Sequence, residues 1–573
     1  MRRKNSEEYR YFFHGVQLIS ILSLFYGYCK ERINTGQSLQ IVIKSLTLKL
    51  SDKMEHKMSC FLGIDIGTSG TKTILIDRDG KLLAQSTATY PLQIPRPGWT
   101  EQAPEDWWQA LVKTVRDVLR MANVSGNNVA GIGLSGQMHG SVFLNKKHDV
   151  IRPALLWNDQ RTVAEVEWLN SVISQQKLLE LTRNPALTGF TAPKILWLRN
   201  NEPDAFKQLD KVLLPKDYIR FRLSGEFATE VSDASGTLLF DVEHRTWSQE
   251  MLDRLELPIS MMPASYESFE ISSKVSKRAA EETGLAEGTP IVGGGGDQAA
   301  GAVGNGIVEP GIVSAVLGTS GVVFAYAETP AYDPDGGLHT FCHAVPDAWH
   351  QMGVTLAAGG SWQWLRNTIF DHESELARKQ NKEPYNVMTK MAASADPGSD
   401  GLYFLPYLSG ERTPHADAYA RGVFFGLSLS HNKNHLARAV MEGVSYSLRD
   451  CLDLMRARGT AIHEIRASGG GARSSLWRQM LADVFDIPVV TINMDEGPAF
   501  GVALLAAVGT GRYSSVAEAC RATIKVTNRL EPDAKNVDIY QQGYTIYRSL
   551  YPTLRSSFQQ ADSARQSIVD SDQ

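Results

Sequence analysis

Two aspartates occupy positions where a carboxylate could take part in chemistry. Asp65 ends the first strand of the stretch FLGIDIGTSGTKTILID, directly before a tight turn. Asp297 follows four consecutive glycines in TPIVGGGGDQAAGAVGNG and precedes a helix rich in alanine and glycine. Glycines let a ligand approach the backbone closely because they carry no side chain. We therefore expect both carboxylates to face a bound ligand, with a helix N-cap as the simpler alternative for Asp297.

The turn after Asp65 has the composition of a phosphate-binding loop. Thr68 and Ser69 supply hydroxyl groups, the glycines supply backbone N–H groups, and Lys72 supplies a positive charge. Such a loop can bind a polyphosphate, and the carboxylate of Asp65 could hold a hydrated magnesium ion beside it. An ordinary β-hairpin with a polar turn is the alternative for this segment taken alone.

The same turn sequence occurs a second time, and this repeat favours the phosphate-binding interpretation. GTSG stands at residues 67–70 and again at residues 318–321, each time between two apolar strands. Two such units suggest two related halves that present phosphate-binding turns to a shared cleft. The arrangement resembles the nucleotide-binding core of actin, Hsp70 and the sugar kinases. It implies an α/β fold in which two ribonuclease-H-like domains surround a central nucleotide and sugar cleft.

Two common phosphate-binding motifs are excluded by their spacing or context. A Walker A loop needs four residues between its first glycine and Gly-Lys-Ser/Thr, and GTSGTKT lacks that spacing. GIGLSG at residues 131–136 fits the pattern G-x-G-x-x-G, but a turn and a strand are predicted after it. A dinucleotide-binding loop should open a helix, so we reject a Rossmann site.

Polar clusters also follow two further predicted strands, at residues 129–135 and 154–157. The first strand leads into Met138 and His139, and the second ends in Trp157 and the residues NDQR. Open α/β sheets bind ligands where their strands end, so these side chains are candidates for a second part of the site. Packing in the core is the alternative for both His139 and Trp157.

Composition indicates a large globular protein without a nucleic-acid or anionic-membrane footprint. The chain has 573 residues, 43% hydrophobic and 21% charged, with a net charge of −5. Its five cysteines are scattered and form no C-x-x-C pair, which favours reduced thiols in the cytosol and no zinc site.

We divide the chain into four parts. Residues 1–57 carry a short apolar run without a cleavage site and are predicted to be an extension outside the fold. Residues 58–306 should form the domain for the sugar and phosphate, and residues 307–550 the domain for the nucleotide. The polar tail, residues 551–573, is expected to be disordered from about Ser556.

The ordered set of motifs resembles the FGGY family of carbohydrate kinases over roughly residues 59–550. The motifs are GIDIGTSGTK, WND-x-R, GFTAPKILWLRNN, GGGGDQAAGA, LGTSG, GVFFGLS followed by HLARAVME, and SGGGARS. The third and sixth are similar to the two signature segments of the family. Met138-His139, where glycerol-phosphorylating members carry Arg-Glu, and PYLSGERTPH at 406–415 are similar to the members that act on D-xylulose.

The resemblance implies a role for individual residues. Asp65 would organise Mg²⁺, and Asp297 would be the general base that accepts the proton of the sugar hydroxyl. The sugar would contact Met138, His139, Trp157, Asp297 and Gln298, although glutamine at 298 departs from the asparagine of some D-xylulose-specific members. The ATP phosphates would lie against Thr68, Ser69, Lys72, Gly318 and Thr319, and the nucleoside against Gly359, Gln363, Gly470 and Gly471.

The implied activity is the cytosolic, ATP-dependent phosphorylation of D-xylulose to D-xylulose 5-phosphate, with Mg²⁺ as cofactor. Two alternatives remain at this point: a kinase of the same fold for another ketose or polyol, and a non-enzymatic, actin-like nucleotide clamp. The sugar-side cluster argues against the clamp, which has no use for a base that faces a small pocket. The expected partners are the sugar and ATP, without nucleic acid or membrane, and a homodimer is one alternative for the assembly.

Overall fold

The computed structural model describes residues 59–494 and 496–571. The chain divides into the unit Met1–Ser59 and the unit Cys60–Gln573, and everything below concerns the second unit. The predicted extension at residues 1–57 lies outside the described residues. No helix in the described part of the chain combines the length and the apolar content needed to cross a bilayer.

The first sheet is mixed and contains the strand that carries Asp65. Its strand order is β13-β14-β5-β1-β2-β3, with β15 also paired to β5. β1 pairs antiparallel with β2 and parallel with β5. The strands are β1 (Cys60–Ile66), β2 (Gly70–Asp77), β3 (Leu82–Thr89), β5 (Val129–Gly136), β13 (Ile271–Lys274), β14 (Pro290–Val292) and β15 (Gly295–Gly296).

The second sheet repeats this plan in the other half of the unit. Its order is β18-β19-β17-β16-β22-β23-β24, and β16 pairs antiparallel with β17 and parallel with β22. The strands are β16 (Gly311–Leu317), β17 (Gly321–Ala327), β18 (His339–Cys342), β19 (Trp349–Thr355), β22 (Ile462–Ser468), β23 (Val489–Ile492) and β24 (Val526–Leu530). Each GTSG turn therefore joins the first antiparallel pair of its own sheet, which confirms the predicted two-part α/β fold.

Strand β1 is buried on both faces, as its sequence predicts. Leu62, Ile64 and Ile66 face helix α3 (Pro104–Ala122) and its core, and Phe61 faces the opposite core. Helix α3 begins with a proline and two acidic residues, which suit the first turn of a helix. Its apolar stripe includes two fully buried tryptophans, so this helix contributes to the core of the first half.

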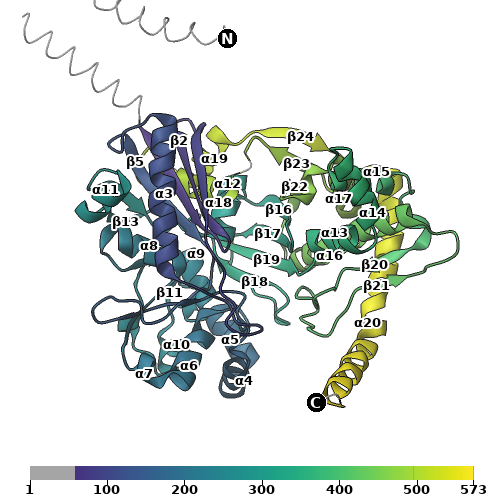
Figure 1. Ribbon diagram of the computed structural model, residues 1–573, viewed down its shortest axis with the longest axis horizontal. Coiled ribbons are helices and arrows are strands. Elements are labelled where there is room, and N and C mark those ends of the chain that lie inside the picture. The colour runs from purple at the N-terminus through teal and green to yellow at the C-terminus, as the bar shows by residue number, and fades with distance from the viewer. Residues whose placement is uncertain (1–58, 495, 572–573) are drawn as a thin grey trace, which may run out of the picture. The chain divides into compact units, whose positions relative to one another are not determined.

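Two helices pack together at glycines where the two halves meet. They are α12 (Asp297–Asn305) and α18 (Gly497–Gly509), which lie between the labelled strands of the two sheets in Figure 1. A Cβ atom on Gly501 would lie 1.8 Å from the carbonyl oxygen of Ala300. Although α18 comes late in the chain, it packs against the first sheet: a Cβ on Gly63 would lie 1.9 Å from the carbonyl oxygen of Ala499.

The remaining elements surround these two sheets. The small two-stranded sheets pair β4 (Glu101–Gln102) with β7 (Ala154–Leu155), β6 (Val142–Asn145) with β8 (Leu209–Leu213), β9 (Ala228–Glu230) with β12 (Ala264–Tyr266), β10 (Phe240–Asp241) with β11 (Thr246–Trp247), and β20 (Tyr403–Leu405) with β21 (Val423–Phe425). The helices of the first half are α4 (Val163–Val172), α5 (Gln175–Thr182), α6 (Thr191–Asn201), α7 (Pro203–Phe206), α8 (Pro215–Ser224), α9 (Val231–Ala234), α10 (Gln249–Arg254) and α11 (Lys277–Thr283). Those of the second half are α13 (Gly359–Thr368), α14 (Asp371–Lys379), α15 (Pro384–Ala393), α16 (Lys433–Ala457), α17 (Ser475–Phe485), α19 (Val516–Thr523) and α20 (Ala534–Ser571).

Two expectations about local structure differ from what is observed. The predicted strand at 154–157 is only the two-residue strand β7, because it pairs with the equally short β4 outside the main sheet. The tail does not become disordered at Ser556, since α20 continues to Ser571. The side chains of Tyr551 and Phe558 are buried against the core of the second half, which the polar composition of the tail did not suggest.

The contact between α12 and α18 leads to a test with opposite outcomes at two glycines. Alanine favours an isolated helix over glycine by about 1 kcal/mol. Gly501→Ala should nevertheless lower the free energy of unfolding, by about 1–3 kcal/mol, because its methyl group would overlap the backbone of α12. Gly301→Ala on α12 is the matched control, since its nearest neighbour would be the Cγ of Pro498 at 3.7 Å. Urea denaturation should show Gly501→Ala destabilised and Gly301→Ala unchanged or stabilised; a stabilised Gly501→Ala variant would contradict the tight packing.

Candidate active site

The first GTSG turn is braced by side chains from several neighbouring elements. The N–H of Gly67 donates to the carbonyl oxygen of Gly70 at 3.1 Å, which closes the turn. The Thr68 hydroxyl donates to Gln137 Oε1 at 3.1 Å and accepts from Trp157 Nε1 at 2.9 Å. These contacts connect the predicted phosphate loop directly to the predicted sugar side.

Asp65 is a carboxylate in an unfavourable environment at the end of β1. Burial raises its pKa to about 6, against the opposing effects of Ser135 and Lys72. Its Oδ1 atom is buried and has no hydrogen-bond partner among the described residues. A buried oxygen without a partner is costly unless a ligand satisfies it, so this position suits a ligand of a hydrated cation.

Asp297 lies within the first turn of α12 and does not cap it. The N-cap residue is Gly296, and no side chain caps this helix. The N-cap interpretation of Asp297 is therefore wrong. Burial and the nearby charge of Asp65 raise the pKa of Asp297 to about 7, while hydrogen bonds from Gln298 act in the opposite direction. A carboxylate with such a pKa can exchange a proton near neutral pH.

The glycines before Asp297 allow neighbouring segments to come close to it. Gly294 has a φ of +76°, and a Cβ atom there would lie 2.0 Å from the carbonyl oxygen of Leu134. At Gly296 a Cβ would lie 2.9 Å from Cγ of Met138. Met138 therefore packs directly beside the start of α12, and the two segments of the predicted sugar site meet here.

His139 is held in a fixed orientation. Its φ is +66°, its Nδ1 lies 2.7 Å from the carbonyl oxygen of Gly236, and its ring packs on Phe190 at 4.5 Å between centroids. Burial lowers the pKa of His139 to about 3, so the imidazole is neutral. With Nδ1–H donating to Gly236, Nε2 is left as an acceptor for a hydroxyl group. Lys194 donates to the carbonyl oxygen of His139 at 2.9 Å and so helps to hold the backbone of this residue.

Trp157 is not a core residue. Its side chain is 43% exposed, although its Nε1 is fixed on Thr68. An exposed aromatic ring held by a hydrogen bond can provide a flat surface for a ligand.

Six of the predicted ATP-binding residues line one cavity of about 890 Å³ in the second half. The second GTSG turn and the start of α13 are joined there by the N–H of Gly359, which donates to the carbonyl oxygen of Gly318 at 2.8 Å. The predicted residues are Gly318, Thr319, Gly359, Gln363, Gly470 and Gly471. Trp362, Tyr385 and Trp477 also line this cavity. The spacing of apolar residues in the sequence could not show that these aromatic side chains face a cavity.

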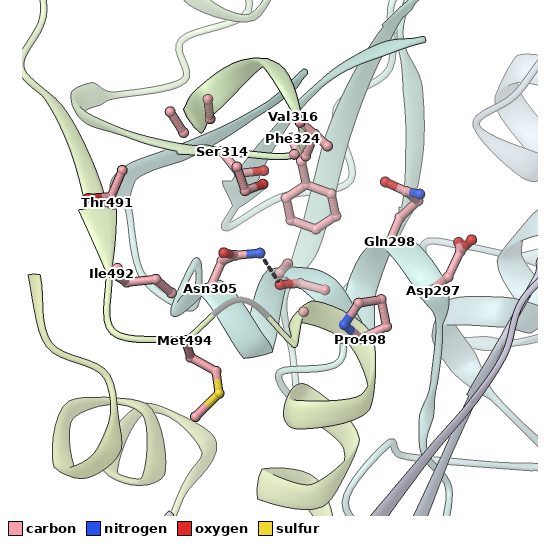
Figure 2. A pocket seen from close by; sticks show the side chains of 18 of the residues that line it. Asp297, Gln298, Asn305, Ser314, Val316, Phe324, Thr491, Ile492, Met494 and Pro498 are labelled. Atoms are coloured by element: carbon pink, nitrogen blue, oxygen red, sulfur yellow. Dashed lines mark hydrogen bonds between the residues drawn. The ribbon is translucent and has the colours of Figure 1, made fainter. Parts of the chain in front are cut away.

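A second cavity of about 540 Å³ begins at Asp297 and Gln298. Figure 2 shows these two side chains at one side, with Asn305 and Phe324 between them and Met494. Gly470 and Arg473 line both cavities, so the space beside Asp297 adjoins the space beside the second GTSG turn. Thr68, Ser69 and Lys72 do not line either cavity.

A buried cluster of charged side chains supports the GGGGD segment at residues 293–297. No sequence motif predicted this cluster. The Lys216 ammonium lies 2.8 Å from Asp217 and 3.0 Å from Asp233, with all three side chains fully buried. Ser232 donates a hydrogen bond to Glu230 of this cluster and accepts one from the N–H of Gly296 at 3.1 Å.

Among the described residues, no group of three or more His, Cys, Asp or Glu could by itself hold a metal ion.

Comparison with known proteins agrees with this architecture. The FGGY family of carbohydrate kinases matches with its N-terminal domain over residues 60–304 and its C-terminal domain over residues 313–510. The chain is 41% identical to a xylulose kinase of Escherichia coli over 495 residues, or 86% of this chain and 99% of that protein. It is 39% identical to a xylulose kinase of Bacillus subtilis over 494 residues, covering 86% and 97%. The crystal structure of a xylulose kinase from Rhodospirillum rubrum is similar with a TM-score of 0.81, at 30% identity, covering 87% and 100% of the two chains.

The raised pKa of Asp297 predicts a pH-dependent effect on stability. A carboxylate whose pKa is higher in the folded than in the unfolded state destabilises the fold once the pH exceeds its unfolded value. Asp297→Asn should therefore raise the free energy of unfolding at pH 8, by roughly 4 kcal/mol. The gain should shrink as the pH falls below 7 and disappear below about pH 3, where the wild-type carboxyl group is neutral in both states.

Unfolding of the wild type and of Asp297→Asn across this pH range measures the effect. Lower stability of the variant at every pH would show that the carboxylate stabilises the start of α12.

Proposed function

Because the chain belongs to the FGGY family of carbohydrate kinases, we propose that it transfers the γ-phosphoryl group of ATP to D-xylulose and releases D-xylulose 5-phosphate and ADP. The observation that carries this proposal is the packing of Met138 against Gly296, which brings the Met138-His139 pair beside Asp297. A neutral acceptor and an apolar surface thus adjoin a carboxylate that can take up a proton. The names of the similar proteins support the choice of sugar.

Asp297 is the general base of the proposed reaction. It accepts the proton of the attacking sugar hydroxyl while the oxygen–phosphorus bond forms and the bond between the γ-phosphorus and the ADP oxygen breaks. Its pKa of about 7 keeps a large fraction ionised at neutral pH and still makes it a better acceptor than an ordinary aspartate. Gln298 and the ring of Trp157 contribute to the sugar site, and His139 Nε2 accepts from a sugar hydroxyl.

The phosphates of ATP lie, in this proposal, between the two GTSG turns. Thr68, Ser69 and Lys72 face them from the first half, and Gly318 and Thr319 from the second. Asp65 would hold Mg²⁺, which when bound neutralises phosphate charge; its buried oxygen without a partner fits that role. The nucleoside occupies the cavity of about 890 Å³ lined by Gly359, Gln363, Gly470 and Gly471.

We place the reaction in the cytosol, where ATP is available and thiols stay reduced. The four cysteines in the described part of the chain are all buried. A homodimer is the assembly we propose to test, by light scattering of the purified protein.

The sugar assignment is tested by a coupled ADP-release assay over a panel of sugars. D-xylulose should give a kcat/KM at least roughly 100-fold above that for glycerol, ribitol or D-ribulose, because polar groups that pair with the hydroxyls of one sugar are left unpaired by another. Equal turnover of glycerol and D-xylulose would refute the assignment. Preference for another ketose would mean that the protein is a kinase of the same family with that ketose as its substrate.

The role of Asp297 is tested by Asp297→Asn. The amide keeps the size of the side chain but cannot accept the proton, so kcat should fall by about 10²–10⁴-fold. Affinity for ATP should stay near the wild-type value, since Asp297 does not line the proposed nucleoside cavity. Near-normal kcat in a correctly folded variant would show that another group, and not Asp297, is the general base. Asp65→Asn is the companion variant, for which we expect a low kcat with little change in KM for the sugar.

A further inference from the structure

Lys72 of the phosphate loop forms an ion pair with a residue from the far end of the chain. Its ammonium nitrogen lies 2.6 Å from Oε2 of Glu496. The Glu496 side chain is 12% exposed, and Gln85 on β3 adds to the contact. With its amide nitrogen turned toward Glu496, Gln85 donates to Oε1 at 2.7 Å and to Oε2 at 3.0 Å.

The position of Glu496 is set by rigid packing of the helix that it precedes. Glu496 is the N-cap residue of α18, and Pro498 stands in the first turn. Two residues of α18, Ala499 and Val502, contact Gly63 on β1 and Gly133 on β5 so closely that a Cβ on either glycine would lie 1.9 Å from a carbonyl oxygen. The carboxylate of Glu496 is therefore fixed relative to β1 and β2, although the sequence separates them widely.

Lys72 is placed between two carboxylates. It lies directly opposite Asp65 in the antiparallel β1–β2 pair, so both side chains emerge on the same face of the sheet. Ile74, two residues along β2, packs in the core that contains α18, so this is the face that α18 covers. Glu496 thus stands at the end of α18 nearest to the Asp65–Lys72 pair.

We propose that Glu496 is a positioning residue that holds the Lys72 ammonium in place for the ATP phosphates. An ammonium group has three donors, so Lys72 can keep its bond to Glu496 and still donate to a phosphate oxygen. The long lysine side chain loses most of its freedom before ATP binds, which lowers the entropic cost of the contact. Glu496 also competes with Asp65 for Lys72 and so leaves the Asp65 carboxylate available. This role rests on the function proposed above.

A double-mutant cycle separates this role from a general effect on stability. The variants are Glu496→Gln, Lys72→Met and the combination of both, and the readouts are kcat/KM for ATP and the Kd of the non-hydrolysable analogue adenylyl imidodiphosphate. Glu496→Gln should lower kcat/KM for ATP and weaken the analogue roughly ten-fold, the size of one charge-assisted contact. KM for the sugar should not change. In the Lys72→Met background, Glu496→Gln should have no further effect, since Glu496 acts through Lys72.

Two further variants complete the design. Glu496→Asp keeps the charge and should restore part of the lost affinity. Asp79→Asn removes a more exposed carboxylate that is also in an ion pair, with Arg512 at 2.9 Å beyond the other end of α18, and should leave both readouts unchanged. Additive effects of the two single variants, wild-type values for Glu496→Gln, or tighter binding of the analogue would each overturn the proposal. A wild-type protein that binds the analogue but phosphorylates no sugar would refute the proposed function alone, because the affinity cycle does not require turnover.

Discussion

The close approach of α18 to the first sheet is the constraint on which the rest of this structure depends. Helix α18 comes late in the chain, yet its backbone contacts β1, β5 and α12 at distances that only glycine permits at Gly63, Gly133 and Gly501. A single methyl group at any of these positions would separate the elements. Because α12 begins with Asp297 and Asp65 is the second-last residue of β1, the spacing of the two acids follows from these glycine contacts.

The same packing places the two carboxylates in different surroundings. Asp65 lies opposite a lysine and near a serine, and its pKa is about 6. Asp297 has no cationic neighbour among the groups that shift its pKa; burial and the charge of Asp65 raise it to about 7. Two acids that repel each other are a cost to the folded state, and ionised groups of this kind are found where a ligand offsets the cost. In the proposed kinase, the metal and phosphates would offset it at Asp65, and the sugar proton at Asp297.

Much of the fold and part of the site could be predicted from local patterns. The repeated GTSG turn led to two sheets of the same plan, and the glycine-rich segments led to six residues of one cavity. What local patterns could not provide was contact between distant segments. Nothing around Lys216 indicates its buried partner Asp233, and nothing near Lys72 indicates Glu496, because these pairs form only when α8 and α18 are packed. The length of α20 was missed for the same reason, since its buried tyrosines are spaced along a polar sequence.

The two GTSG turns have different neighbours, so each half would contribute a different part of the proposed site. In the first half the turn is tied to polar side chains of the sugar side, through the bonds of Thr68 to Gln137 and Trp157. In the second half the turn is joined to a helix start, through Gly318 and Gly359, and leaves a large cavity open. A sugar bound beside the first turn and a nucleoside bound beside the second would therefore bring hydroxyl and phosphate together only between the turns. In the proposed kinase, the reactive groups would meet where both turns supply donors, and this geometry would favour transfer to the sugar over transfer to water.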